Sequence, residues 1–232
     1  MEKINIKSKN LSNYVMFMLD KIENSFTKEE LNKITDVVIN YNDEDDDDFL
    51  EDLLKLENIK SITLRNGYIF NDNYNIFLKL NNLTEIVFEK CEFEDVNLIT
   101  SLKLKSLSLI NCKIEDYSFM SLLENLEELS IVNGTLEIKK LNMLKHLRYL
   151  QISYSNIIDN EKLNISSLVE LYIDNTNIFV FDFLNNLSEL KRISIDENQY
   201  NNNKDLFNDL MKENILVLNE NMVEFGGENN EI

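Results

Sequence analysis

The sequence predicts an α/β solenoid built from one repeated unit of a short strand and a return segment. In the clearest copy, Leu126, Leu129 and Ile131 fall on one face, Gly134 takes the turn and Leu136 brings the chain inward. Copies begin at residues 34, 59, 83, 104, 126, 147, 168 and 190. These starts differ by 25, 24, 21, 22, 21, 21 and 22 residues, a period typical of repeats that stack around a shared core.

The repeated frame L-x-x-L-x-L-x-x-N/C/G/T-x-I/L resembles the short leucine-rich repeats of bacterial internalin-like proteins, over residues 34–219. The resemblance implies a leucine-rich repeat solenoid: a curved right-handed superhelix with a parallel β-sheet on its concave face. It also implies non-catalytic protein binding. The residue that ends each strand is commonly Asn in that family, but here only Asn42 and Asn198 are Asn. The other repeats carry Gly67, Cys91, Cys112, Gly134, Ser155 and Thr176, so a side-chain ladder there should be discontinuous.

We expect three parts: an N-terminal helical cap (1–33), a solenoid of about eight repeats plus a closing strand (34–219) and a flexible acidic tail (220–232). An apolar stripe predicts a helix near 10–24 that covers the first repeat. Its members are Leu11, Tyr14, Val15, Met18, Leu19 and Ile22. Thr27 and Glu30 have the spacing of a capping box and predict a second short helix.

The return segments are expected to form 3₁₀ or short helical turns on the convex side, because apolar residues recur there at every third position. Leu141, Leu144 and Leu147 give one example. Near the C-terminus, residues 205–211 predict a short helix and residues 215–218 predict the strand that closes the stack.

The charge balance disfavours two classes of partner. The chain has 23 Lys and Arg against 42 Asp and Glu, a formal net charge of −19, which opposes binding to nucleic acid and to anionic membranes. The sequence has no apolar run near the roughly 18 residues that a membrane span needs, and its start lacks a secretory signal pattern. We therefore expect a cytoplasmic monomer.

Two groups of residues invite a chemical role. The acidic run Asp43–Asp48 lacks the alternating ligands and the glycine of an EF-hand calcium loop, which favours a solvated loop. Cys91 and Cys112 hold the same position in adjacent repeats, within disulfide range of about 5 Å. A reducing cytosol favours free, structural thiols over a redox or metal site.

No motif for phosphate binding, dinucleotide binding or zinc proteolysis occurs, and His146 is the only histidine. We expect no enzymatic activity, no metal and no cofactor. The leading hypothesis is a module that binds a protein partner, possibly with a basic surface, through the concave sheet. The alternative is an acidic inhibitor or immunity protein that blocks a basic enzyme. A third, a repeat-targeted effector, lacks room for a catalytic domain after Leu218.

The predicted partner-binding surface consists of outward strand positions, because alternate strand residues face opposite sides. By this alternation Leu129 and Ile131 face the core, and Ser130 and Gln151 face solvent. The predicted site residues are Ile110, Val132, Tyr149, Tyr154 and Tyr172, with the acidic neighbours Glu170, Asp174, Asp196 and Glu197. Ile110 should stack beside Val132, and Tyr149 should contact Tyr172. In the competing interpretation, the tyrosines pack on each other and cover Ser108 and Ser130.

Overall fold

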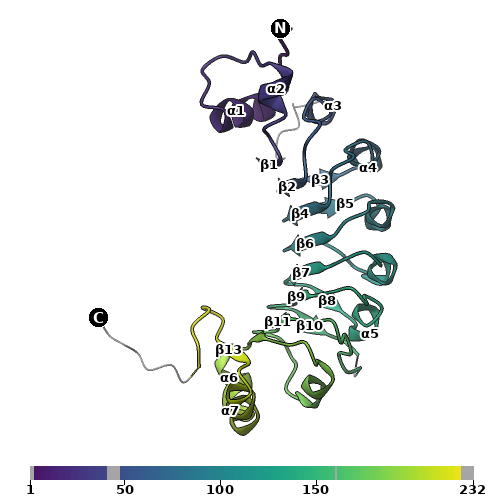
Figure 1. The fold of residues 1–232 in the computed structure, drawn as a ribbon. Coiled ribbons are helices and arrows are strands. Elements are labelled where there is room, and N and C mark those ends of the chain that lie inside the picture. The colour runs from purple at the N-terminus through teal and green to yellow at the C-terminus, as the bar shows by residue number, and fades with distance from the viewer. Residues whose placement is uncertain (1–2, 41–47, 160, 226–232) are drawn as a thin grey trace, which may run out of the picture. The chain divides into compact units, whose positions relative to one another are not determined.

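The computed structural model describes residues 3–40, 48–159 and 161–225. The chain divides into two compact units, Met1–Ile114 and Glu115–Ile232, which we call unit 1 and unit 2. In each unit, strands lie along one side and helical turns lie along the other (Figure 1). We call the sheet surface that faces away from the helical turns the open face of that unit.

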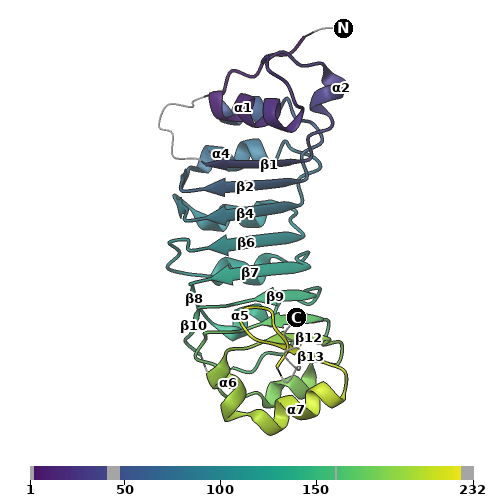
Figure 2. The same cartoon turned by 90° about the vertical axis from the view of Figure 1, so that its left-hand side faces the viewer.

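The sheet of unit 1 consists of strands that each belong to one repeat, and all its pairings are parallel (Figure 2). In order across the sheet they are β1 (Asp36–Asn40), β2 (Ser61–Arg65), β4 (Glu85–Glu89) and β6 (Ser106–Ile110). Ile62 pairs with Ile86, and Ile86 pairs with Leu107, so equivalent repeat positions are in register. All three side chains are fully buried.

The return segments of unit 1 combine α-helices with a 3₁₀ helix. The repeats that start at 34 and 59 are the longest, and they hold α3 (Phe49–Leu53) and α4 (Asn71–Phe77). The shorter repeat that follows holds the 3₁₀ helix η1 (Val96–Ser101), and β3 (Tyr68–Ile69) pairs with β5 (Glu92–Phe93). The extra residues of the early repeats make room for the wider α-helical turn, which the three-residue spacing alone did not predict.

The N-terminal cap begins with α1 (Lys9–Met18), which packs against β1. Val15 is fully buried there, as predicted. The helix ends earlier than the apolar stripe suggested, because Asp20 adopts a left-handed conformation with φ of 52°. Met18 is 50% exposed and Ile22 is 97% exposed, so the prediction that both cover the first repeat is wrong.

The cap is held by hydrogen bonds as well as by apolar contacts. The amide of Ser8 donates to the buried Asp52 carboxylate of α3 at 2.7 Å. At α2 (Lys28–Leu31), Thr27 and Glu30 form the predicted capping box. A hydrogen bond from Lys21, with another from the Thr27 amide, lowers the pKa of Glu30 to about 2. The carboxylate therefore stays ionised over the physiological pH range.

Unit 2 repeats the same parallel arrangement. In order its strands are β7 (Glu128–Val132), β9 (Tyr149–Gln151), β11 (Glu170–Tyr172), β12 (Arg192–Ser194) and β13 (Leu216–Leu218). The strands after β7 are shorter than those of the unit 1 sheet. A separate pair joins β8 (Thr135–Leu136) to β10 (Asn156–Ile157). The predicted closing strand at 215–218 corresponds to β13.

The helical segments of unit 2 are short, as the repeat length predicts. The return segments contain η2 (Ser118–Leu122), α5 (Ile138–Leu141) and η3 (Asp182–Asn186). Two helices follow β12: α6 (Glu197–Asn202) and α7 (Lys204–Lys212). The helix predicted at 205–211 corresponds to α7. Because α6 begins at Glu197, Asn198 lies in a helix and does not end a strand, which corrects the predicted frame at that repeat.

The six repeats that start at residues 59, 83, 104, 126, 147 and 168 each leave their strand through a residue in the left-handed region. These residues occupy the same repeat position and have φ between 54° and 64°: Asn66, Lys90, Asn111, Asn133, Tyr154 and Asn175. Asn tolerates this conformation better than other residues with a side chain. Lys90 and Tyr154 therefore carry a backbone strain that their equivalents avoid.

The two cysteines of unit 1 are free and buried. Cys91 Sγ lies 3.4 Å from the Leu64 carbonyl oxygen, and Cys112 Sγ lies 3.3 Å from that of Phe88. A hydrogen bond that its thiol donates to Cys91, together with burial, raises the pKa of Cys112.

Most of the acidic run Asp43–Asp48 lies outside the described residues, whereas Asp48 pairs with Lys7 at 3.1 Å.

Candidate functional site

The open face of unit 2 holds most of the predicted site residues. Tyr149 lies in β9, and Glu170 and Tyr172 lie in β11. The two strands pair so that Tyr149 stands opposite Glu170 and Gln151 stands opposite Tyr172. Between these outward residues, Leu150 and Leu171 point into the core and are fully buried. The alternation that defines the face is thus present.

Tyr149 and Tyr172 form an aromatic pair. Their ring centroids are 5.0 Å apart and the rings are tilted by 37°, which confirms the predicted contact. Tyr172 is only 6% exposed, whereas Tyr149 is half-buried. Burial, followed by nearby negative charge, raises the pKa of Tyr149 to about 12. Tyr149 is therefore the more exposed and neutral ring of the pair, and Tyr172 packs against it.

Arg192 of β12 joins this pair, although it is not among the predicted site residues. Glu170 Oε2 accepts a hydrogen bond from Tyr172 Oη at 2.8 Å and another from Arg192 Nη1 at 3.0 Å. The ion pair is partly buried, because the two side chains are 38% and 31% exposed. The repeat period could have predicted this residue, because Arg192 occupies the outward position that Tyr149 and Glu170 hold in the two preceding repeats.

A chain of polar side chains runs beside the aromatic pair. Ser130 Oγ donates to Gln151 Oε1 at 2.7 Å, and Gln151 Nε2 donates to Ser153 Oγ at 3.4 Å. Ser153 Oγ in turn donates to Asp174 Oδ1 at 2.9 Å. Ser130 is buried, so the prediction that it faces open solvent is wrong. Its hydroxyl is covered because Gln151 on the next strand folds over it.

Most of the acidic residues near this face already have hydrogen-bond partners. Asp174 is 6% exposed and also accepts from Ser194 Oγ at 3.4 Å. Asp196 is the N-cap of α6: its side chain accepts from the amides of Asn198 and Gln199. Glu197 is exposed on the first turn of that helix. These carboxylates therefore contribute to the fold as well as to the charge of the surface.

The other predicted site residues lie further apart. Tyr154 follows β9 in the left-handed turn and is 57% exposed. Val132 ends β7 in unit 2, and Ile110 ends β6 in unit 1. Because these two residues belong to different units, their stacking stays a prediction.

The C-terminal end of the described chain covers the edge of the unit 2 sheet beside β13. Leu218 forms an antiparallel bridge with Glu224, and the Phe225 amide donates to the Val217 carbonyl at 3.0 Å. The Phe225 ring stacks on Tyr200 with centroids 4.1 Å apart. Residues 220–225, at the start of the predicted flexible tail, thus extend the sheet and shield its last strand.

In the described ranges, no group of three or more His, Cys, Asp or Glu side chains could hold a metal ion. None of the helices in the same ranges is long and apolar enough to cross a membrane. His146 is exposed.

The arrangement of strands and turns is shared with solved structures of bacterial internalins. An internalin (InlF) from Listeria monocytogenes matches over 82% of this chain and 56% of its own, with 20% identity and a TM-score of 0.59. Internalin C2 (InlC2) from the same species matches over 84% of this chain and 97% of its own, with 20% identity and a TM-score of 0.54. The fold is that of an internalin-like leucine-rich repeat protein.

The chain thus spans little more than half of the InlF structure. A leucine-rich repeat protein of Leptospira interrogans, LIC12759, matches over 62% of this chain and 40% of its own, with 18% identity and a TM-score of 0.48. The sequence itself matches no family model and no curated protein. The leucine-rich repeat identification therefore rests on repeat spacing and backbone geometry together.

Proposed function

We propose that this internalin-like chain is a non-catalytic protein-binding module whose contact surface is the open face of unit 2. The observation that carries the proposal is the Tyr149–Tyr172 pair, which is fixed by a polar network across neighbouring strands. Tyrosine and arginine are enriched at the energetic centres of protein interfaces. A surface whose side chains are already held in place loses less conformational entropy on binding.

The partner expected for this surface presents an apolar or aromatic anchor with Lys or Arg around it. Tyr149 and Tyr154 would contact the anchor, and Glu197 would meet the basic border. The net charge of −19 favours such a partner at long range, and salt screens this attraction beyond about 8–10 Å. Binding through this face should therefore weaken, without disappearing, as salt rises.

Affinity capture with the whole chain tests the proposal. Wild-type protein, Tyr149→Ala and the matched variant Val38→Ala would each be immobilised and exposed to the same cell extract. Val38 is an outward residue of the unit 1 sheet and is 39% exposed. We expect wild type and Val38→Ala to retain the same protein and Tyr149→Ala to lose most of it. Equal capture by all three variants would contradict the proposal.

A further inference from the structure

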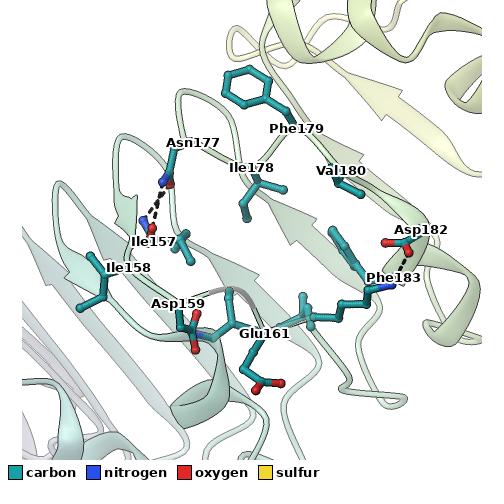
Figure 3. A pocket seen from close by; sticks show the side chains of 13 residues that line it. Ile157, Ile158, Asp159, Glu161, Asn177, Ile178, Phe179, Val180, Asp182 and Phe183 are labelled. Carbon is teal, nitrogen blue, oxygen red and sulfur yellow. Dashed lines mark hydrogen bonds and ion pairs between the residues drawn. The ribbon is translucent and has the colours of Figure 1, made fainter.

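A recess lies among the return segments of unit 2, separate from the open face. It has a volume of about 390 Å³. It is lined by residues 157–159, 161–163, 177–180, 182 and 183, with Ile138 as a further wall. Figure 3 shows Phe179 and Val180 on one side of the recess and Ile158 on the other. We call this recess the return-segment pocket.

The pocket exists because one return segment contains no helix in its described residues. The segments before and after it contain α5 and η3, whereas residues 158, 159 and 161–167 are irregular. In the α5 segment, Leu141, Leu144 and Leu147 fill the core at every third position. Among the described residues after Ile157, the next core residue is Leu163. Ile158, Asp159, Glu161 and Lys162 lie between them outside the core and leave the space unfilled.

The pocket combines a buried apolar floor with an unusually exposed apolar rim. Ile157 and Phe183 are buried at its base. Ile158, Phe179 and Val180 are 60%, 51% and 69% exposed around it. Side chains of this kind gain when a ligand removes them from water, and a contiguous exposed group of them marks an interaction site.

The charge of the rim favours a ligand that carries positive charges. Three carboxylates, those of Asp159, Glu161 and Asp182, line the pocket with one ammonium, that of Lys162. Lys162 forms an ion pair with Asp182. Asp159 accepts from the amides of Ile138 and Lys139, each at 2.9 Å, which holds its charge beside the pocket. The carboxylates of Asp159 and Glu161 thus leave the rim negative.

We propose that the return-segment pocket binds an extended segment of a partner protein in which apolar side chains are flanked by Lys or Arg. The apolar side chains would fill the floor between Ile157 and Phe183, and the cations would face Asp159 and Glu161. A second copy of this chain is a poor occupant, because each copy carries a net charge of −19. The pocket and the open face of unit 2 can be tested separately.

A defined peptide provides the probe. The whole chain, labelled at Ile and Val methyl groups, would be titrated by NMR with the peptide acetyl-Lys-Ile-Leu-Lys-amide. Two further peptides test the chemistry: in one Glu replaces both Lys residues, and in the other Ser replaces Ile and Leu. The Val180→Asp variant tests the location. Val223→Asp is its matched control, since Val223 is 54% exposed and lies outside the pocket.

We expect saturable methyl shifts at Ile157, Ile178 and Val180 with a Kd on the order of 1 mM. Either altered peptide should bind at least about fivefold more weakly. Val180→Asp should lower the affinity by a similar factor or abolish binding, and Val223→Asp should not. Shifts spread over unrelated methyl groups, equal binding of the acidic peptide or equal binding by Val180→Asp and Val223→Asp would each overturn the proposal.

Discussion

The open faces of the two units are built on the same repeat frame but differ in how their side chains are connected. In unit 1, outward residues such as Thr63 and Val87 are half-buried aliphatic or hydroxyl groups, and Arg65 pairs with Glu89 at 2.8 Å in an ion pair near solvent. In unit 2, hydrogen bonds run from Ser130 through Gln151 and onward to Asp174. An aromatic pair lies beside them.

This contrast shows which positions of the repeat are free to acquire a function. Inward positions are restricted to Leu, Ile and similar residues in both units, because they fill the core of their own unit. Outward positions do not affect the frame, so they can be polar, aromatic or charged. A network of fixed side chains at those positions in unit 2 is the feature that distinguishes a candidate binding surface from a plain sheet.

The largest effect should come from the core, where the two units are equivalent. Leu107 in β6 and Leu150 in β9 hold the same repeat position, and both are fully buried. We expect Leu107→Ala and Leu150→Ala each to lower the free energy of unfolding by about 2–5 kcal/mol, because each leaves a cavity. Urea denaturation measures this. A loss under about 1 kcal/mol in only one unit would contradict the shared frame.

The next largest loss of stability should differ between the two open faces. Asp174 and Glu89 hold the same outward repeat position, but Asp174 is buried between two serine hydroxyls, whereas Glu89 pairs near solvent. Asp174→Ala should cost about 1–3 kcal/mol, because buried donors lose their acceptor. Glu89→Ala should cost about 0–1 kcal/mol. Equal losses in urea denaturation would mean that the unit 2 network adds no stability.

Ser130 and Ser108 offer a finer version of the same test. Both hold one outward repeat position, and Ser130 is buried with a hydrogen bond to Gln151, whereas Ser108 is half-buried. We expect Ser130→Ala to cost about 0.5–1.5 kcal/mol. Ser108→Ala should stay within about 0.5 kcal/mol. Thermal unfolding of both variants and of wild type measures these losses of stability. A larger loss for Ser108→Ala than for Ser130→Ala would contradict the stabilising role of the Ser130 hydrogen bond.

The smallest expected effect is a gain in stability. Tyr154 in unit 2 and Lys90 in unit 1 adopt the left-handed conformation that Asn holds in four equivalent repeats. Tyr154→Asn and Lys90→Asn should each raise the free energy of unfolding by about 0.5–1 kcal/mol. If Tyr154 is kept for binding, Tyr154→Asn should also weaken capture of the partner, whereas Lys90→Asn should not. A loss of stability in either variant would show that its side chain supports the turn.

The repeat frame could be predicted from the sequence because leucine spacing determines which residues enter the core. The left-handed turns were missed even though Asn66, Asn111, Asn133 and Asn175 recur at the repeat period. The predicted asparagine position lies one residue later, where internalin-like repeats commonly carry it. The helix α6 was missed for a similar reason: Asp196 and Gln199 form a capping box, but the repeat frame predicted a strand there.

For the candidate site, the sequence predicted which residues lie on neighbouring strands but not how deeply each side chain is buried. The contact of Tyr149 with Tyr172 follows from their places on neighbouring strands, which the period gives. The burial of Tyr172 and Asp174 depends on side chains from adjacent strands, such as Arg192 and Ser194, and no local pattern encodes it. The exposure of Ile22 was missed because helical spacing does not show where a helix ends.

The central claim is that a partner binds the open face of unit 2. The most direct test compares how substitutions on the two open faces change the affinity for that partner. Once a partner has been captured, its affinity for Tyr149→Ala and for Val87→Ala would be measured by calorimetry, after circular dichroism has shown that both variants are folded. Tyr149 and Val87 are half-buried outward residues of unit 2 and unit 1. We predict that Tyr149→Ala raises the Kd at least about fivefold, a loss of about 1 kcal/mol, and that Val87→Ala leaves it within about twofold. An unchanged Kd for Tyr149→Ala together with a clear loss for Val87→Ala would contradict the assignment of binding to unit 2.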